Sequence, residues 1–84
     1  MEKSKIEGGR EMNEVEMIYV SSSNVESVGY DEVNQIAHVR FLNGTLYIYK
    51  GVPKNEFDGL LNAPSIGSYL HRNFKNVYPY ERIE

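Results

Sequence analysis

Apolar and polar residues alternate between about residues 15 and 50, and beyond that point apolar residues recur every three or four positions. Two short apolar runs, at 15–20 and 25–30, are each followed by a polar turn, and both predict strands. Two β-rich runs, at 36–42 and 45–50, flank Asn43-Gly44, a dipeptide that tolerates positive φ at both central positions of a type I′ turn. The pattern therefore predicts an antiparallel sheet of three or more strands with a central hairpin.

A two-residue turn would also fix the register of this hairpin, with Arg40 opposite Tyr47 and His38 opposite Tyr49. One face of the hairpin would then be wholly apolar and would form the core side, with Ala37, Val39, Phe41, Leu46 and Ile48. The other face would bring aromatic and basic groups together, with His38, Arg40, Tyr47 and Tyr49.

After residue 50 the apolar spacing changes to three and four, which indicates helices. Pro53 suits a first helical position, and Pro64 disfavours helical geometry in the residue before it, so a first helix is predicted between them. Gly59 in its interior costs ~1 kcal/mol relative to Ala. Ser65 predicts the N-cap of a second helix whose apolar face holds Ile66, Tyr69, Leu70 and Phe74. The fold class is α+β, with two C-terminal helices packed on one face of the sheet.

Composition sets the limits of this domain. Residues 1–14 mix Glu, Lys and Gly without a sustained apolar period, so we expect a disordered acidic arm, then one domain at 15–80 and a frayed end at 81–84. The 84 residues include no cysteine, which excludes disulfides and thiolate zinc sites. No signal peptide or run of ~18 apolar residues is found, so we expect a cytoplasmic protein without membrane contact.

Residues with catalytic or metal-binding chemistry do not form a defensible site. His38 and His71 are the two imidazoles, and neither has a neighbour at metal-ligand spacing. A set of Ser23 or Ser27 with His38 and Asp31 lacks a nucleophile elbow and an oxyanion loop. The serine cluster at 21–23 is typical of a turn. We expect a protein without enzymatic activity, cofactor or metal.

The predicted Tyr47 and Tyr49 face is the candidate binding surface. Its rings would stack on the bases of single-stranded RNA, with Arg40 and His38 at phosphate and Lys50 reaching in from the hairpin's edge. Two structural interpretations stay open beside this one. The face is cross-strand packing, with Arg40 against Tyr47, or it is covered by the first strand or by Tyr78 and Tyr80. The net charge of −3 does not support a dedicated nucleic-acid binder.

A set of short motifs in a fixed order resembles the KTSC domain family. The motifs are 20–25 (VSSSNV), 28–31 (VGYD), 39–41 (VRF), Asn43-Gly44, 47–49 (YIY), Val52-Pro53 and 63–69 (APSIGSY). The resemblance covers roughly residues 17–80 and implies a short module at the C-terminus of some lysyl-tRNA synthetases, also found as a stand-alone bacterial protein. It implies no known activity, only a suspected role in binding RNA. Relatives often place basic residues at the positions of Ile66 and Ser68, and their absence here weakens that role.

Two functions from different classes follow from the sequence. The first is a module that binds RNA or another single-stranded nucleic acid through the Tyr-x-Tyr face. The alternative is a protein-interaction module that uses a sheet edge or the aromatic second helix.

Overall fold

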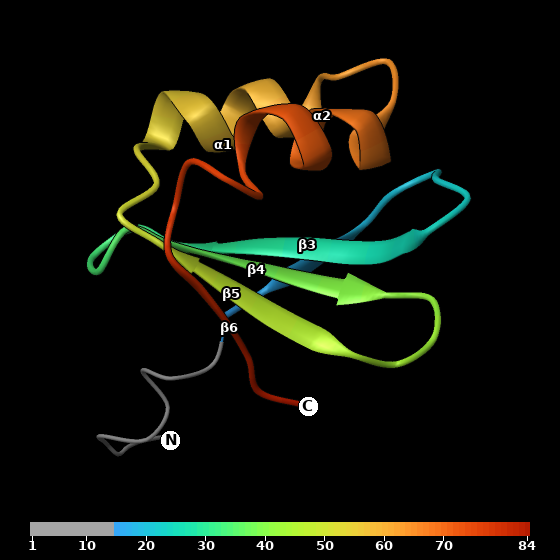
Figure 1. Ribbon diagram of the computed structural model, residues 1–84, viewed down its shortest axis with the longest axis horizontal. Coiled ribbons are helices and arrows are strands. Elements are labelled where there is room, and N and C mark those ends of the chain that lie inside the picture. Colours follow the sequence, from blue (N-terminus) through green and yellow to red (C-terminus); the bar gives the residue numbers. More distant parts are fainter. Residues whose placement is uncertain (1–14) are drawn as a thin grey trace, which may run out of the picture.

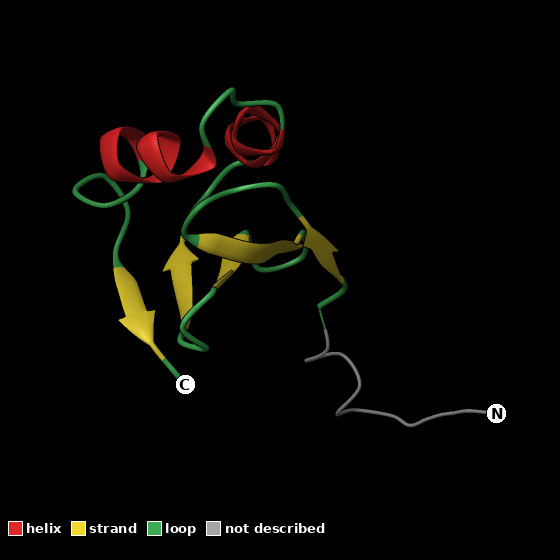
Figure 2. Cartoon of the chain, turned by 90° about the vertical axis from the view of Figure 1, so that its right-hand side faces the viewer, coloured by secondary structure: helices red, strands yellow, loops and turns green. Residues whose placement is uncertain are grey.

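The computed structural model describes residues 15–84 as one antiparallel sheet with two helices on one of its sides (Figures 1 and 2). Its elements are β2 (Met17–Tyr19), β3 (Val25–Asp31), β4 (Ile36–Phe41), β5 (Leu46–Lys50), α1 (Lys54–Leu61), α2 (Ile66–Asn73) and β6 (Tyr80–Arg82). The five strands lie in the order of the sequence, and β6 returns after the helices to the free edge of β5. The predicted α+β class, with its central hairpin and two following helices, is confirmed. The predicted arm at 1–14 lies outside the described residues.

The hairpin between β4 and β5 is present, but its turn differs from the prediction. The Gly44 amide donates to the Phe41 carbonyl over 2.9 Å and the Phe41 amide to the Thr45 carbonyl over 2.9 Å, so the loop holds three residues. Gly44 alone in this loop has positive φ, at 94°, whereas a type I′ turn also needs it at the residue before. The two-residue type I′ prediction is therefore wrong. A three-residue loop with glycine in the left-handed region replaces it.

One extra loop residue shifts the register and exchanges the two faces of β5. Ala37 lies opposite Tyr49 and Val39 opposite Tyr47, while Arg40 lies opposite Leu46. Because side chains alternate along a strand, Tyr47 and Tyr49 point to the helical side of the sheet. Leu46 and Ile48 share the other side, which we call the open side, with His38 and Arg40. The predicted composition of both faces is thus corrected on β5 and holds on β4.

The core lies between the sheet and the helices, and aromatic rings fill its middle. Phe74, which is fully buried, meets the rings of Tyr49 and Tyr78 edge-on at centroid distances of 5.4 and 5.3 Å. Tyr30 stacks on Phe57 at 4.9 Å and donates its hydroxyl to the Val52 carbonyl. The buried core residues are Val25, Val28, Ala37, Val39, Tyr49, Val52, Phe57, Leu60, Ile66, Leu70 and Phe74.

Close packing of the two helices explains the glycine inside α1. A Cβ atom at Gly59 would overlap the Tyr69 hydroxyl, so the absence of a side chain at this position leaves room for the Tyr69 ring. That hydroxyl donates to Glu56 Oε2 over 2.7 Å, a bond that holds the pKa of Tyr69 above its usual value. The predicted N-cap is confirmed at Ser65, whose hydroxyl accepts from the Ser68 amide over 3.3 Å.

The C-terminal residues form a strand where fraying was expected. Tyr80 to Arg82 pair with β5, and the Lys50 amide donates to the Pro79 carbonyl over 2.8 Å. The sequence did not predict this strand because all three of its residues are exposed and show no apolar alternation. Within 15–84, neither helix is long and apolar enough to cross a membrane.

Candidate functional site

The structure separates the residues predicted to form one binding face. Tyr47 and Tyr49 lie on the helical side of the sheet, whereas His38, Arg40 and Lys50 belong to the open side. Tyr49 is only 6 % exposed, and this burial raises the pKa of its hydroxyl. Tyr47 keeps a partly exposed ring beside the rings of Phe41 and Tyr80. The predicted grouping of these residues on one face is therefore wrong. Of the two C-terminal tyrosines considered as a cover, Tyr80 lies against the pair, whereas Tyr78 packs on Phe74.

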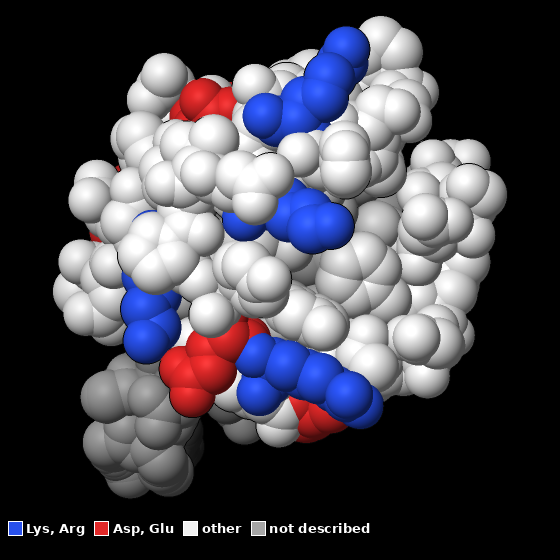
Figure 3. All heavy atoms as spheres, in the orientation of Figure 1, with Lys and Arg blue, Asp and Glu red and all other residues white. Residues whose placement is uncertain are grey.

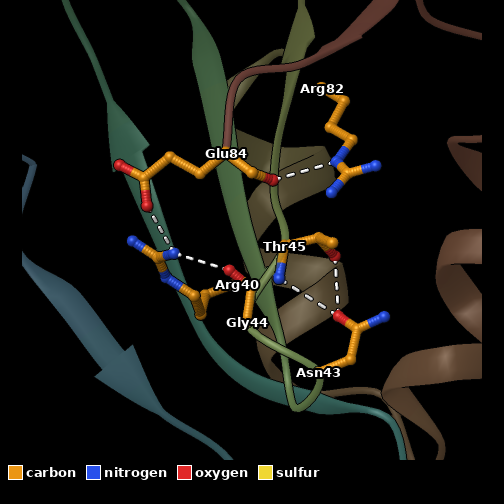
Figure 4. A network of polar contacts seen from close by, with 6 residues as sticks. All are labelled: Arg40, Asn43, Gly44, Thr45, Arg82 and Glu84. Atoms are coloured by element: carbon orange, nitrogen blue, oxygen red, sulfur yellow. Dashed lines mark hydrogen bonds and ion pairs between the residues drawn. The ribbon is translucent and has the colours of Figure 1, made fainter.

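Basic groups of the predicted face are already engaged by the C-terminal segment. Arg40 Nη1 donates to the Gly44 carbonyl over 2.9 Å and pairs with Glu84 Oε1 at 2.6 Å (Figure 4). Lys50 Nζ lies 3.3 Å from Glu81 Oε1. The His38 ring is half-buried, which lowers its pKa and favours the neutral form. None of the three offers a free positive charge for phosphate.

The surface beside the N-terminal half of the sheet and α2 has a cavity that basic side chains line. A cavity of about 920 Å³ lies between the serine loop at 21–24 and α2. Figure 3 shows the surface indented between the lobe at the right and the helical layer above it. Ser22 stabilises the loop, because its hydroxyl accepts from the Asn24 and Val25 amides at 3.2 Å. The lining residues on the helix side include Ser65, Ser68, His71 and Arg72.

A second hollow of about 360 Å³ continues this cavity towards the hairpin loop. The two share Asn24, Gly67 and His71, so we treat them as one groove. Its narrow end has an aromatic and apolar wall and a polar rim. The wall consists of Phe41, Tyr47, Tyr49, Leu70 and Tyr80, and the rim of Asn24, Asn43, Thr45, His71 and Lys75.

The groove has basic and donor groups but no carboxylate among its lining residues. His71, Arg72 and Lys75 line it, and neither Arg72 nor Lys75 forms an ion pair within residues 15–84. Asn43 Oδ1 accepts from the Thr45 amide and hydroxyl at 3.1 and 2.8 Å, which leaves its amide nitrogen pointing away from the turn (Figure 4). Such a lining favours a ligand rich in negative charge and hydrogen-bond acceptors.

His71, Arg72 and Lys75 lie outside the apolar face predicted for the second helix, and none of them was among the predicted binding residues. His71 and Arg72 are neighbours in the last turn of α2, and Lys75 follows just beyond the end of the helix. The sequence alone could not assign these residues to a site, because the serine loop that lines the same groove is distant along the chain. In the described part of the chain, no three His, Asp or Glu side chains are grouped as a metal site would require.

Several known proteins are similar to this chain in sequence and in fold. The KTSC domain family matches residues 21–78. An uncharacterised protein of Stutzerimonas stutzeri is 40 % identical over 68 residues, which are 80 % of this chain and 96 % of that protein. A lysine–tRNA ligase of a Nostoc species is 33 % identical over 61 residues, only 11 % of the ligase. The crystal structure of a KTSC domain protein from Yersinia pestis superposes with a TM-score of 0.78 at 29 % identity, covering 84 % of this chain and 100 % of that one. The chain therefore belongs to the KTSC domain family.

Proposed function

We propose that this KTSC domain is a non-enzymatic module that binds single-stranded RNA in the groove between the serine loop and α2. The observation that carries the proposal is a carboxylate-free groove with an aromatic wall and cations that no carboxylate of residues 15–84 neutralises. The residues differ from those predicted from the sequence. Tyr47 stays in the site, while His71, Arg72 and Lys75 replace His38, Arg40 and Lys50.

Each part of the groove suits one part of a nucleotide chain. Arg72 and Lys75 attract phosphates, and the serine hydroxyls and the free Asn43 amide hydrogen-bond to phosphate or sugar oxygens. The partly exposed Tyr47 ring offers a stacking surface for a base. Double-stranded RNA suits the groove less well, because its bases are not free to reach the aromatic wall. The matched segment in a protein named lysine–tRNA ligase agrees with RNA as the ligand class.

A protein partner is the second candidate, and the sheet edges favour it. β2 and β6 are both edge strands of three residues, and Tyr19 on β2 is 76 % exposed. An extended peptide can add to such an edge through main-chain hydrogen bonds. This mode needs no basic groove, so it predicts responses at β2 or β6 and none at α2.

A chemical-shift titration with short single-stranded oligouridine separates the two candidates. Wild-type amides around Asn24, Asn43 and 67–75 should shift at low salt and lose most of the response at high salt. Arg72→Ala and Lys75→Ala should each weaken binding and reduce the salt slope by about 0.7. Lys54→Ala is the matched control, because it removes the same charge from an exposed lysine of α1 outside the groove. If the folded wild type gives no RNA-dependent shifts even at low salt, the protein-partner candidate replaces this one.

A further inference from the structure

Tyr80 lies against both tyrosines of the Tyr-x-Tyr pair. Its ring centroid is 5.9 Å from that of Tyr47 and 5.6 Å from that of Tyr49, with interplanar angles of 40° and 37°. All three rings line the narrow end of the groove. On their other sides, Phe41 holds Tyr47 and Phe74 holds Tyr49, each by an edge-on contact. The side occupied by Tyr80 is therefore the side from which another flat ring can approach the pair.

Main-chain hydrogen bonds to β5 hold the strand that brings Tyr80 to this position. β6 has three residues, all exposed, and lies at the edge of the sheet. Two ion pairs hold the C-terminal segment, Lys50 with Glu81 of β6 and Arg40 with Glu84 beyond the strand. Both are exposed and therefore screened by salt. Short, exposed edge elements of this kind open locally at low cost, without unfolding of the core.

Tyr80 itself is half exposed, at 49 %, whereas Tyr49 beneath it is at 6 %. Moving the Tyr80 ring aside would uncover the Tyr49 ring and widen the exposed area of Tyr47. Base–aromatic stacking tolerates any base, since each base has a flat π surface. The same contacts that Tyr80 makes are thus open to a nucleobase.

We propose that the Tyr47–Tyr49 pair is a base-stacking subsite, an inference that rests on the proposed function. In the free protein Tyr80 occupies this subsite, and in the complex a base of single-stranded RNA takes its place. The ligand of this subsite is a nucleobase, and Tyr80 is its intramolecular competitor. Phosphates on either side of the inserted base lie within the basic part of the groove. RNA binding is then coupled to release of β6 from the groove.

The test compares RNA affinity of the wild type with Tyr80→Ala, Tyr80→Phe and Tyr19→Ala. Removal of the competing ring should tighten binding by about two- to tenfold, the factor that the energy of an aromatic pair converts to. Tyr80→Phe keeps the competing ring and should not show this gain in affinity. Tyr19→Ala is the matched control, because it removes an exposed tyrosine from the opposite edge strand. In the wild type, nuclear Overhauser contacts between Tyr80 and Tyr47 should disappear when RNA saturates the protein.

The outcomes separate this inference from the proposed function. Wild-type binding with unchanged or weaker binding by a folded Tyr80→Ala variant overturns the inference alone, and so do ring contacts that persist in the complex. If the folded wild type does not bind RNA at low salt, the proposed function and the subsite both fail. A dispersed amide spectrum of each variant establishes that it is folded.

Discussion

The two sides of the sheet differ in what covers them: one packs against the helices, and the other carries charged side chains. On the helical side, Val39 and Tyr49 are buried against the helices, and Tyr47 forms part of the aromatic wall of the groove. On the open side, His38 and Arg40 lie beside Leu46 and Ile48. The cations of this side, Arg40 and Lys50, are paired with carboxylates of the C-terminal segment. A cluster of aromatic and basic residues in a strand pattern therefore does not by itself locate a binding surface. Within residues 15–84, the groove cations without a carboxylate partner are Arg72 of α2 and Lys75 just after the helix.

The largest contrast between the two sides should be in stability. Phe74→Ala removes a fully buried ring from contacts with Tyr49, Tyr69 and Tyr78, so the free energy of unfolding should fall by about 3–5 kcal/mol. Ile83→Ala, at a side chain that is 46 % exposed, should cost less than about 1 kcal/mol. Urea unfolding monitored by circular dichroism measures both. Equal losses would mean that the open side also holds the fold together.

The tight fit of the helical layer predicts an inverted glycine effect. Alanine in place of a helical glycine normally gains up to ~1 kcal/mol. At Gly59 the new methyl group overlaps the Tyr69 hydroxyl, so Gly59→Ala should instead destabilise the protein by about 1–3 kcal/mol. Gly67→Ala is the control, because the nearest atom to its methyl group, Asn24 Nδ2, is 3.8 Å away. Thermal unfolding should show a lower Tm than the wild type for Gly59→Ala, and an equal or higher Tm for Gly67→Ala.

The ion pair on the open side should matter much less. Arg40 and Glu84 have side-chain exposures of 30 % and 56 %, so solvent screens their attraction. Arg40→Ala should lower the free energy of unfolding by less than about 1 kcal/mol, and by less still at high salt. A double-mutant cycle with Glu84→Ala isolates the coupling. A coupling that persists at high salt would show that this pair is more protected than its exposure indicates.

The smallest expected effect is a pH dependence from the same side. Burial lowers the pKa of His38, so below about pH 6.5 the unfolded chain takes up this proton before the folded protein does. Stability is therefore complete above that pH and falls as the pH drops towards the folded pKa. His38→Gln should flatten the dependence of the unfolding free energy on pH across this window. The same slope in His38→Gln as in the wild type would contradict the assignment.

The sequence predicts the elements well because the signals for them are local. Alternation marks the strands, and Pro53 and Ser65 mark the helix starts. The register failed because Asn43-Gly44 fits two loops, and in the longer one only Gly44 needs positive φ. Alternation could not decide between them, since β5 has large apolar groups on both sides. The groove was missed for another reason: it joins the serine loop to α2, and no local pattern reports that long-range contact.

The path of the chain through the sheet has a kinetic consequence. β2, β3, β4 and β5 each pair with a strand adjacent in sequence, so their contacts close short loops and should form early. β6 is the exception, because its partner β5 precedes both helices, and it must wait until they have brought the chain back across the sheet. We therefore expect the last strand to dock late during refolding and to leave first during unfolding. Mutations in β6 should consequently change the unfolding rate far more than the folding rate.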